Sequence, residues 1–153
     1  MAAERIVVGV DGSEGADSAV RWCARYARTL DAEVAAVAVI EPNVPLVPPP
    51  DTYAEAMQQA EDAEREKARA TLERDWCRPI RDAGVRYEAR SILGDPAETL
   101  METATELGAA LLVVGRHGRG GFIEALLGSV PRKLAHRAEL PLLIVPSGYR
   151  PVE

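Results

Sequence analysis

The sequence predicts an α/β protein in which a parallel β-sheet is covered by helices on both faces. Two observations support this: short apolar runs alternate with amphipathic stretches, and the runs are apolar at nearly every position. Such continuous runs are typical of strands buried on both faces, as in a parallel sheet. Because the 153 residues contain no internal repeat and no second apolar core, we expect a single domain over residues 1–153, with its core at about 4–147.

Five segments are expected to form the strands. They lie at residues 6–10, 34–40, 85–93, 109–114 and 142–145. After the first run, apolar residues from Ala16 to Leu30 recur at three- and four-residue spacing, which predicts an amphipathic helix. Good helix formers from Thr52 to Ala83 predict a second helix, which Pro79 should kink or end.

Further helical features follow from local patterns. In the second half of the 52–83 helix a stripe recurs every four residues and should face the core; it consists of Ala68, Leu72, Trp76 and Ile80. Asp95 followed by Pro96 and Glu98 is a typical helix start, with Asp95 as the cap. The last helix is expected to begin near Gly128 and Ser129.

Residues 41–51 form a connector that we expect to be exposed. Five of the nine positions from 42 to 50 are proline, which excludes a helix or a central strand. A mobile loop is the simpler interpretation, and a lid over a binding site is the alternative.

Charge and cysteine content exclude several classes of protein. The net charge of −6 disfavours a general nucleic-acid binder, which usually carries a basic excess. No apolar run approaches the roughly 20 residues of a membrane-spanning helix, and no basic leader precedes a long apolar stretch. Cys23 and Cys77 have neither metal-ligand nor C-x-x-C spacing and read as reduced thiols. We therefore expect a cytoplasmic protein without a membrane or nucleic-acid partner.

Three polar or glycine-rich breaks follow predicted strands, at residues 9–13, 93–95 and 115–118. Ligands of open parallel sheets bind beyond the carboxyl ends of the strands, where the strand order reverses. If the first and fourth strands are neighbours there, the Asp11 carboxylate faces the glycine-rich loop. Loop N–H groups can then hold phosphates, while the carboxylate binds ribose hydroxyls or a metal ion.

The segment from 115 to 137 is locally positive. Its only acid is Glu124, and its basic residues are Arg116, Arg119, Arg132, Lys133 and Arg137. In an acidic chain this favours one specific anion, although a solvated helix face is the alternative. Its glycines allow positive φ and a close approach of the backbone to a ligand; they are Gly115, Gly118, Gly120 and Gly121. Ser129 can cap the last helix or hold phosphate oxygens.

The glycine spacing resembles the G-x2-G-x9-G-[S/T] pattern of the ATP-binding universal stress proteins. Gly115, Gly118, Gly128 and Ser129 occupy its fixed positions. The resemblance extends to Val-Gly-Val-Asp-Gly-Ser at the first strand, Leu-Gly-Asp-Pro after the third and Leu-Leu-Gly-Ser-Val at the last helix. It covers roughly residues 4–147, and the combination is specific although each piece alone is weak.

This resemblance implies a Rossmann-like, adenine nucleotide alpha hydrolase-like sheet of order 3-2-1-4-5, a bound ATP, and a homodimer paired through residues 142–145. It implies that Asp11 lies near the ribose, the phosphates and any Mg²⁺ bound with ATP, and that Gly9 lets the nucleotide approach. It implies that adenine lies near Val39 and that Gly94 lines the site. The phosphate- and ribose-binding residues implied are Gly115, Arg116, His117, Gly118, Arg119, Gly120, Gly121, Gly128, Ser129 and Val130.

We therefore expect an ATP-binding regulatory protein of the stress response rather than a turnover enzyme. The chain has no G-x4-G-K-[ST] loop, no dinucleotide-binding G-x-G-x-x-G after the first strand and no G-x-S-x-G elbow, so any ATP hydrolysis should be slow. A receiver domain is disfavoured because Asp11 has no acidic neighbour. Two alternatives remain open: cyclic AMP or another adenine nucleotide in the same site, and a dimeric interaction module without nucleotide.

Overall fold

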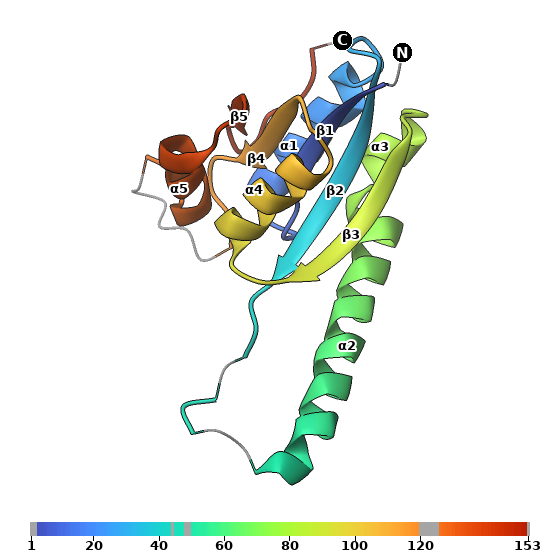
Figure 1. Ribbon diagram of the computed structural model, residues 1–153. Coiled ribbons are helices and arrows are strands. Elements are labelled where there is room, and N and C mark those ends of the chain that lie inside the picture. The colour runs from blue at the N-terminus through green and yellow to red at the C-terminus, as the bar shows by residue number, and fades with distance from the viewer. Residues whose placement is uncertain (1–2, 44, 48–49, 120–125, 153) are drawn as a thin grey trace.

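The computed structural model describes residues 3–43, 45–47, 50–119 and 126–152, and Figure 1 shows one twisted sheet with helices on both sides. The five strands are β1 (Glu4–Gly9), β2 (Ala32–Ile40), β3 (Tyr87–Leu93), β4 (Leu111–Gly115) and β5 (Leu142–Val145). All neighbouring strands are parallel, in the order β3-β2-β1-β4-β5. The predicted fold class and strand order are therefore confirmed.

The strand order reverses at β1, which lies in the middle of the sheet. In register, Val8 of β1 pairs with Ala36 of β2 on one side and with Val113 of β4 on the other. The chain leaves β1 toward one face and β4 toward the other, so that their carboxyl ends open beside each other. This is the edge at which a ligand site is expected in such a sheet.

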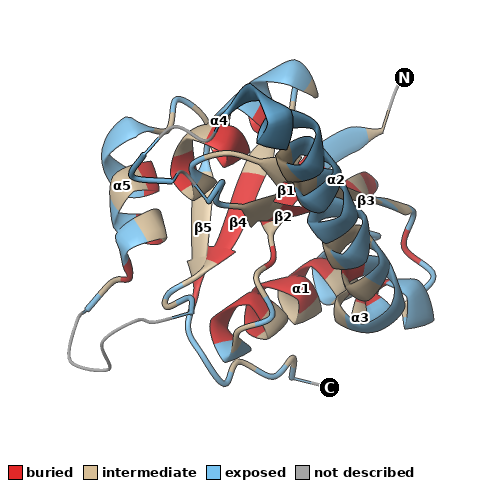
Figure 2. Cartoon of the chain, turned by 90° about the horizontal axis from the view of Figure 1, so that it is seen from below, coloured by how far each residue is buried: buried red, intermediate tan, exposed pale blue. Residues whose placement is uncertain are grey.

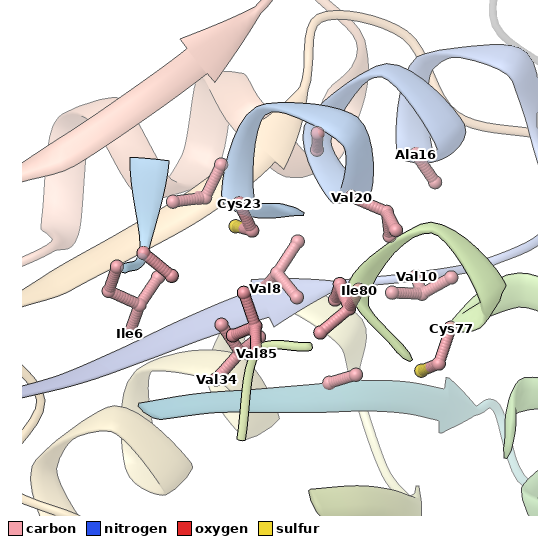
Figure 3. Packing of buried hydrophobic residues seen from close by; sticks show 14 of the residues in the cluster. Ile6, Val8, Val10, Ala16, Val20, Cys23, Val34, Cys77, Ile80 and Val85 are labelled. Carbon is pink, nitrogen blue, oxygen red and sulfur yellow. The ribbon is translucent and has the colours of Figure 1, made fainter. Parts of the chain in front are cut away.

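Each face of the sheet has its own apolar core. Helix α1 (Glu14–Tyr26) and the short helix α3 (Arg78–Asp82) cover one face, where Val8, Val20 and Ile80 are buried together (Figure 3). Helices α4 (Pro96–Glu106) and α5 (Ser129–Arg137) cover the other face, around Leu100, Leu112 and Leu134. In Figure 2 the buried surfaces of α1 and α4 face the sheet and their outer surfaces are exposed, as amphipathic spacing predicts.

Helix α1 ends earlier than the apolar spacing predicts. Its last residue is Tyr26, although the apolar pattern continues to Leu30. Asp31 has a φ of 49°, and the Ala32 N–H donates to the Ala27 carbonyl at 2.8 Å. A left-handed residue at this point turns the chain back into β2, which limits the helix irrespective of the side chains before it.

The helix predicted over residues 52–83 forms as four successive segments. A 3-10 turn at Asp51–Tyr53 leads into α2 (Ala54–Thr71), which is followed by a π-helical turn at Leu72–Trp76 and by α3. Pro79 lies in the first turn of α3, where its missing N–H needs no helical acceptor. The expected break is therefore confirmed, and it takes the form of a wide turn in the residues before the proline.

Helix α2 extends beyond the sheet and contains no buried residue (Figure 1). Of the predicted core-facing stripe, Ala68 is only partly buried, and full burial begins at Leu72. The described connector residues 41–43, 45–47 and 50 are exposed and belong to no helix or strand, as predicted. Among the described helices, none is both long enough and apolar enough to cross a membrane.

Candidate functional site

The loops that follow β1 and β4 meet at the side chain of Asp11. Its Oδ1 accepts the N–H of Ser13 at 2.9 Å, and its Oδ2 accepts the N–H of Arg119 at 3.0 Å. Asp11 and Arg119 are 108 positions apart in the sequence, so this contact exists only because β1 and β4 are neighbours. The expectation that the Asp11 carboxylate faces the glycine-rich loop is confirmed.

Two of the loop glycines are required by close contacts, one with a side chain and one with a backbone. A Cβ at Gly118 would stand 2.7 Å from the Asp11 Oδ2, and one at Gly115 would collide with the backbone of Gly15 at the start of α1. Neither glycine has a positive φ, so that part of the expectation is wrong for both. Gly120 and Gly121 lie outside the described residues. At Gly12, by contrast, φ is +81°, and the backbone there needs glycine for its conformation as well.

The start of α5 supplies the second half of the site. Gly128 is the N-cap, with no side-chain cap, and Ser129 is the first helical residue. Ser129 therefore does not cap the helix, which corrects one of its two predicted roles, and its exposed position lies in the first helical turn. The Gly128 N–H donates to the Arg116 carbonyl at 2.8 Å and closes the base of the loop. A helix start without a side-chain cap leaves N–H groups for an anion or water.

Three predicted site residues have packing reasons for their identity. A Cβ at Gly9 would stand 2.9 Å from Leu100 of α4, so the glycine makes room for a helix. A Cβ at Gly94 would collide with the Thr99 hydroxyl, and Val130 packs against the core of the α4 face. Gly94 and Val39 lie at the carboxyl ends of β3 and β2, farther along the same edge of the sheet.

Most of the positive charge on α5 is paired within the protein. Lys133 forms an ion pair with Asp95 at 3.2 Å, and Arg137 pairs with Glu98. Arg132 donates to the Leu127 carbonyl at 3.1 Å. For Lys133 and Arg137 the helix-face interpretation is the better one, because α4 and its cap present acids opposite them.

The remaining cations of the segment lie in the loop itself. Arg116 and Arg119 are both exposed, and neither pairs with a carboxylate of the described residues. The backbone of His117 lies against Gly15 at the start of α1, which places this segment against the helix. The charge available to an anion is therefore concentrated between residues 116 and 119 rather than spread along α5.

Trp76 lies at the site and was missed by the sequence analysis. Its Cζ2 would be 2.5 Å from a Cβ at Gly12, and the Arg119 guanidinium carbon lies 5.8 Å from the centroid of its ring. The spacing with Leu72 and Ile80 predicted a core position, and Trp76 does pack partly against that core. No local pattern indicates that a π-helical turn will bring the ring to the glycine-rich loop.

The described residues hold no obvious metal cluster. Across residues 3–119 and 126–152, apart from the short undescribed gaps, no group of three or more His, Cys, Asp or Glu side chains converges.

Asp95, the predicted cap, accepts the Glu98 N–H at 3.0 Å, and this bond is the main reason that the pKa of its carboxyl lies below the ordinary value. Lys133 lowers the pKa of Asp95 further, so this carboxylate interacts with both α4 and α5.

Comparison with known sequences points to one family. The profile of the universal stress protein family matches residues 2–146. A universal stress protein of Mycobacterium bovis is 32% identical over 146 residues, which cover 93% of this chain and 48% of the relative. One from Methanocaldococcus jannaschii is 29% identical and is covered to 81% of its length, with 93% of this chain. The chain thus spans about half the length of the mycobacterial relatives that it matches.

Solved structures have the same fold. The universal stress protein UspA from Lactobacillus plantarum matches with a TM-score of 0.77 at 18% identity, covering 95% of this chain and 99% of the other. A universal stress protein in complex with cAMP matches with a TM-score of 0.63 at 29% identity, over 97% and 100% of the two chains. One from Archaeoglobus fulgidus was solved in complex with dAMP; it has a TM-score of 0.61 at 24% identity, over 95% and 99%. With the family profile matched from the first strand to the last, the chain belongs to the universal stress protein family.

Proposed function

We propose that this universal stress protein binds an adenine nucleotide, with ATP as its principal ligand, and acts as a nucleotide-dependent regulatory protein. The observation that carries the proposal is the junction at Asp11, where a carboxylate, a glycine-rich loop and the start of α5 share one edge of the sheet. Relatives of this chain were solved with adenine nucleotides, including one at 29% identity with cAMP.

The chemistry of the junction suits a nucleotide. Donors for phosphate oxygens are the N–H groups at the start of α5, the Ser129 hydroxyl, and the guanidinium groups of Arg116 and Arg119. The Asp11 carboxylate already accepts two backbone N–H groups, and its remaining lone pairs can accept ribose hydroxyls. Mg²⁺ is commonly held by one or two carboxylates together with substrate phosphates, so Asp11 also suits an ion that arrives with ATP.

The proposal is for binding and regulation with slow hydrolysis at most. The chain lacks the pattern that would place a lysine at the β- and γ-phosphates. A nucleotide that stays bound can shift the protein between two states only through its different affinity for them. The functional output is therefore a difference in conformation or in partner binding between the loaded and the empty protein.

Cyclic AMP is the second candidate ligand. It is favoured by the relative solved with cAMP, and by the pairing of Lys133 and Arg137 with acids, which leaves less positive charge for a triphosphate. Cyclic AMP carries a single phosphate charge, so it needs only part of the loop.

The first test is the nucleotide content of freshly purified protein, followed by calorimetric titration of the emptied protein. ATP, ADP, AMP and cyclic AMP are compared at one ionic strength, with and without Mg²⁺. Tightest binding of ATP supports the proposal, and tightest binding of cyclic AMP favours the second candidate. A protein that is purified empty and binds none of the four would contradict nucleotide binding and favour an interaction module.

A further inference from the structure

Trp76, Gly12 and Arg119 form a three-way contact beside the proposed nucleotide site. The Arg119 guanidinium carbon lies over the Trp76 ring, 5.8 Å from its centroid. Gly12 lies against both side chains, because a Cβ there would stand 2.5 Å from Trp76 Cζ2 and 2.9 Å from Arg119 Nη2. The three residues come from different segments: the loop after β1, the π-helical turn and the loop after β4.

The π-helical turn that carries Trp76 is firmly built. Leu72 and Cys77, which precede and follow Trp76 in the sequence, are fully buried, and the Cys77 N–H donates to the Leu72 carbonyl at 2.8 Å. Two carbonyls of the turn are bonded by one side chain: Arg81 donates to the carbonyl of residue 73 at 2.7 Å and to that of residue 74 at 3.2 Å. The ring therefore has a fixed support, and single π-helical turns are frequently found at functional sites.

Arg119 is held at two points, and its guanidinium edge remains available. Its backbone N–H donates to Asp11 Oδ2 at 3.0 Å, and its side chain lies over Trp76. No carboxylate of the described residues pairs with its guanidinium, in contrast to Lys133 and Arg137 on α5. An arginine whose face rests on an aromatic ring keeps its N–H donors in the plane of the guanidinium, where they can bind phosphate.

We propose that Trp76 is a positioning residue of the nucleotide site: its ring holds the Arg119 guanidinium at the mouth of the site, where the N–H donors meet the phosphates. This inference rests on the proposed function, because it names the residue that orders one of the phosphate-binding groups in advance. A long side chain that is already ordered loses less conformational entropy on binding. The gain should be larger for a ligand with more phosphates, since Arg119 acts through its charge.

The test is a double-mutant cycle in calorimetric titrations with ATP and with AMP. The proteins are the unmodified chain, Trp76→Leu, Trp76→Phe, Arg119→Ala and the combination of Trp76→Leu with Arg119→Ala. Trp22→Phe is the matched control, because Trp22 belongs to α1, where its ring packs on Tyr26 with centroids 5.0 Å apart and against the core of that face. Circular dichroism and thermal melting check that each variant is folded.

We expect Trp76→Leu and Arg119→Ala each to weaken ATP binding by about three- to tenfold, the range of a cation–π contact, and AMP binding by less. The combined variant should bind like Arg119→Ala alone, because the two residues act as one unit. Trp76→Phe keeps an aromatic face and should retain most of the affinity. Trp22→Phe should bind as the unmodified chain does.

Several outcomes would overturn the inference while the proposed function stands. They are ATP binding by folded Trp76→Leu equal to that of the unmodified chain, no effect of Arg119→Ala, or losses that multiply in the combined variant. No binding of any nucleotide by the unmodified chain overturns the proposed function and this inference together.

A second measurement covers the case in which Trp76→Leu does not fold. The chain has two tryptophans, so in Trp22→Phe the tryptophan fluorescence, excited selectively over tyrosine, comes from Trp76 alone. Adding ATP should change its emission, and adding Arg119→Ala to this chain should remove most of that change. Emission that ignores ATP under conditions where calorimetry detects binding would contradict the inference.

Discussion

Asp11 connects the two loops of the site through both of its oxygens, one to Ser13 and one to Arg119. A single side chain therefore sets how close the loop after β4 comes to the loop after β1. Gly118 is the residue that this proximity constrains most directly, because the carboxylate lies where its side chain would begin.

Replacement of Gly118 by alanine should weaken ATP binding by about tenfold or more, because a 2.7 Å contact with Asp11 Oδ2 must be relieved by moving the loop. Gly84→Ala is the matched control. Gly84 has a φ of +69° and open space around it, so alanine there should lower stability and leave binding unchanged. Calorimetry and thermal melting on both variants check this, and unchanged affinity in Gly118→Ala would remove the close approach from the binding mechanism.

The two cysteine thiols should be unreactive in the folded protein. Both are buried and free; burial raises the pKa of Cys77 to about 12 and raises that of Cys23 as well. Because the folded pKa values lie above the unfolded value of about 8.5, the neutral thiols contribute stability below that pH and lose it as the pH rises further. Ellman's reagent at pH 8 should therefore label both thiols only after denaturation, and rapid labelling of the native protein would contradict this.

At the residue scale, the local sequence predicted which residues lie at the site better than it predicted the contacts that require them there. The G-x2-G-x9-G-[S/T] spacing located Gly115, Gly118, Gly128 and Ser129 at one edge of the sheet. The contacts that require glycine there come from Asp11 and from α1, which are distant in sequence. The local sequence therefore could not predict that Gly115 and Gly118 lack a positive φ. The place of Trp76 at the site was missed for the same reason, because its neighbours Gly12 and Arg119 are brought to it only by the tertiary structure.

At the scale of elements, the clearest helix start is that of α4. Asp95 caps it through the Glu98 N–H and also pairs with Lys133 of α5. The Asp95 carboxylate thus interacts with two helices. Its capping of α4 could be predicted from the local sequence, whereas its ion pair with Lys133 could not.

Asp95→Ala should lower the free energy of unfolding by about 1 kcal/mol at neutral pH, the usual value for a lost N-cap. Asp95→Asn, which can still cap, is the control and should lose less. The pKa of Asp95 is lowered in the folded protein, so the carboxylate contributes stability above the unfolded value of about 3.9, and this contribution disappears as the pH falls through the folded pKa. Urea unfolding of Asp95→Ala and the unmodified chain should therefore differ least at the lowest pH, and a gap independent of pH would contradict it.

Helix α2 illustrates what helix propensity can and cannot predict. Its charged side chains pair along the helix, as in Arg65 with Asp62 and Arg69 with Glu66, and such exposed pairs support a helix modestly. The helix was therefore predictable from local sequence. Its π-helical turn was not, because the turn depends on the burial of Leu72 and on the two carbonyls that Arg81 bonds.

At the scale of the whole molecule, the fold class followed from apolar runs that alternate with helical stretches, and the strand order followed from the family resemblance. The predicted bounds of the first four strands differ from the observed ones by one or two residues, because register with a neighbour decides where pairing stops, whereas those of β5 agree. The role of the positive charges was harder to predict. The basic residues of α5 form a positive segment in the sequence, but the acids that pair with them lie at α4, which the local sequence of α5 does not reveal.

We expect the protein to be a dimer in solution that pairs through β5. Sedimentation should give twice the mass of the chain at micromolar concentration, because β5 is an edge strand with backbone groups available to a second copy. Leu143→Lys should lower the dimer fraction, and Glu88→Gln on the opposite edge strand β3 should not. A monomer at every concentration would contradict the proposed pairing.

The two edge strands of the sheet differ in how readily a further strand can pair with them. β3 carries Glu88 and Arg90, whose side chains form an ion pair at 3.1 Å, and charges on an edge strand discourage a further strand. β5 has four residues between Pro141 and Pro146, and neither proline can donate an N–H to an added strand. Two copies joined at β5 would present only charged β3 edges outward. Such a dimer would therefore resist aggregation into fibres through its sheet edges.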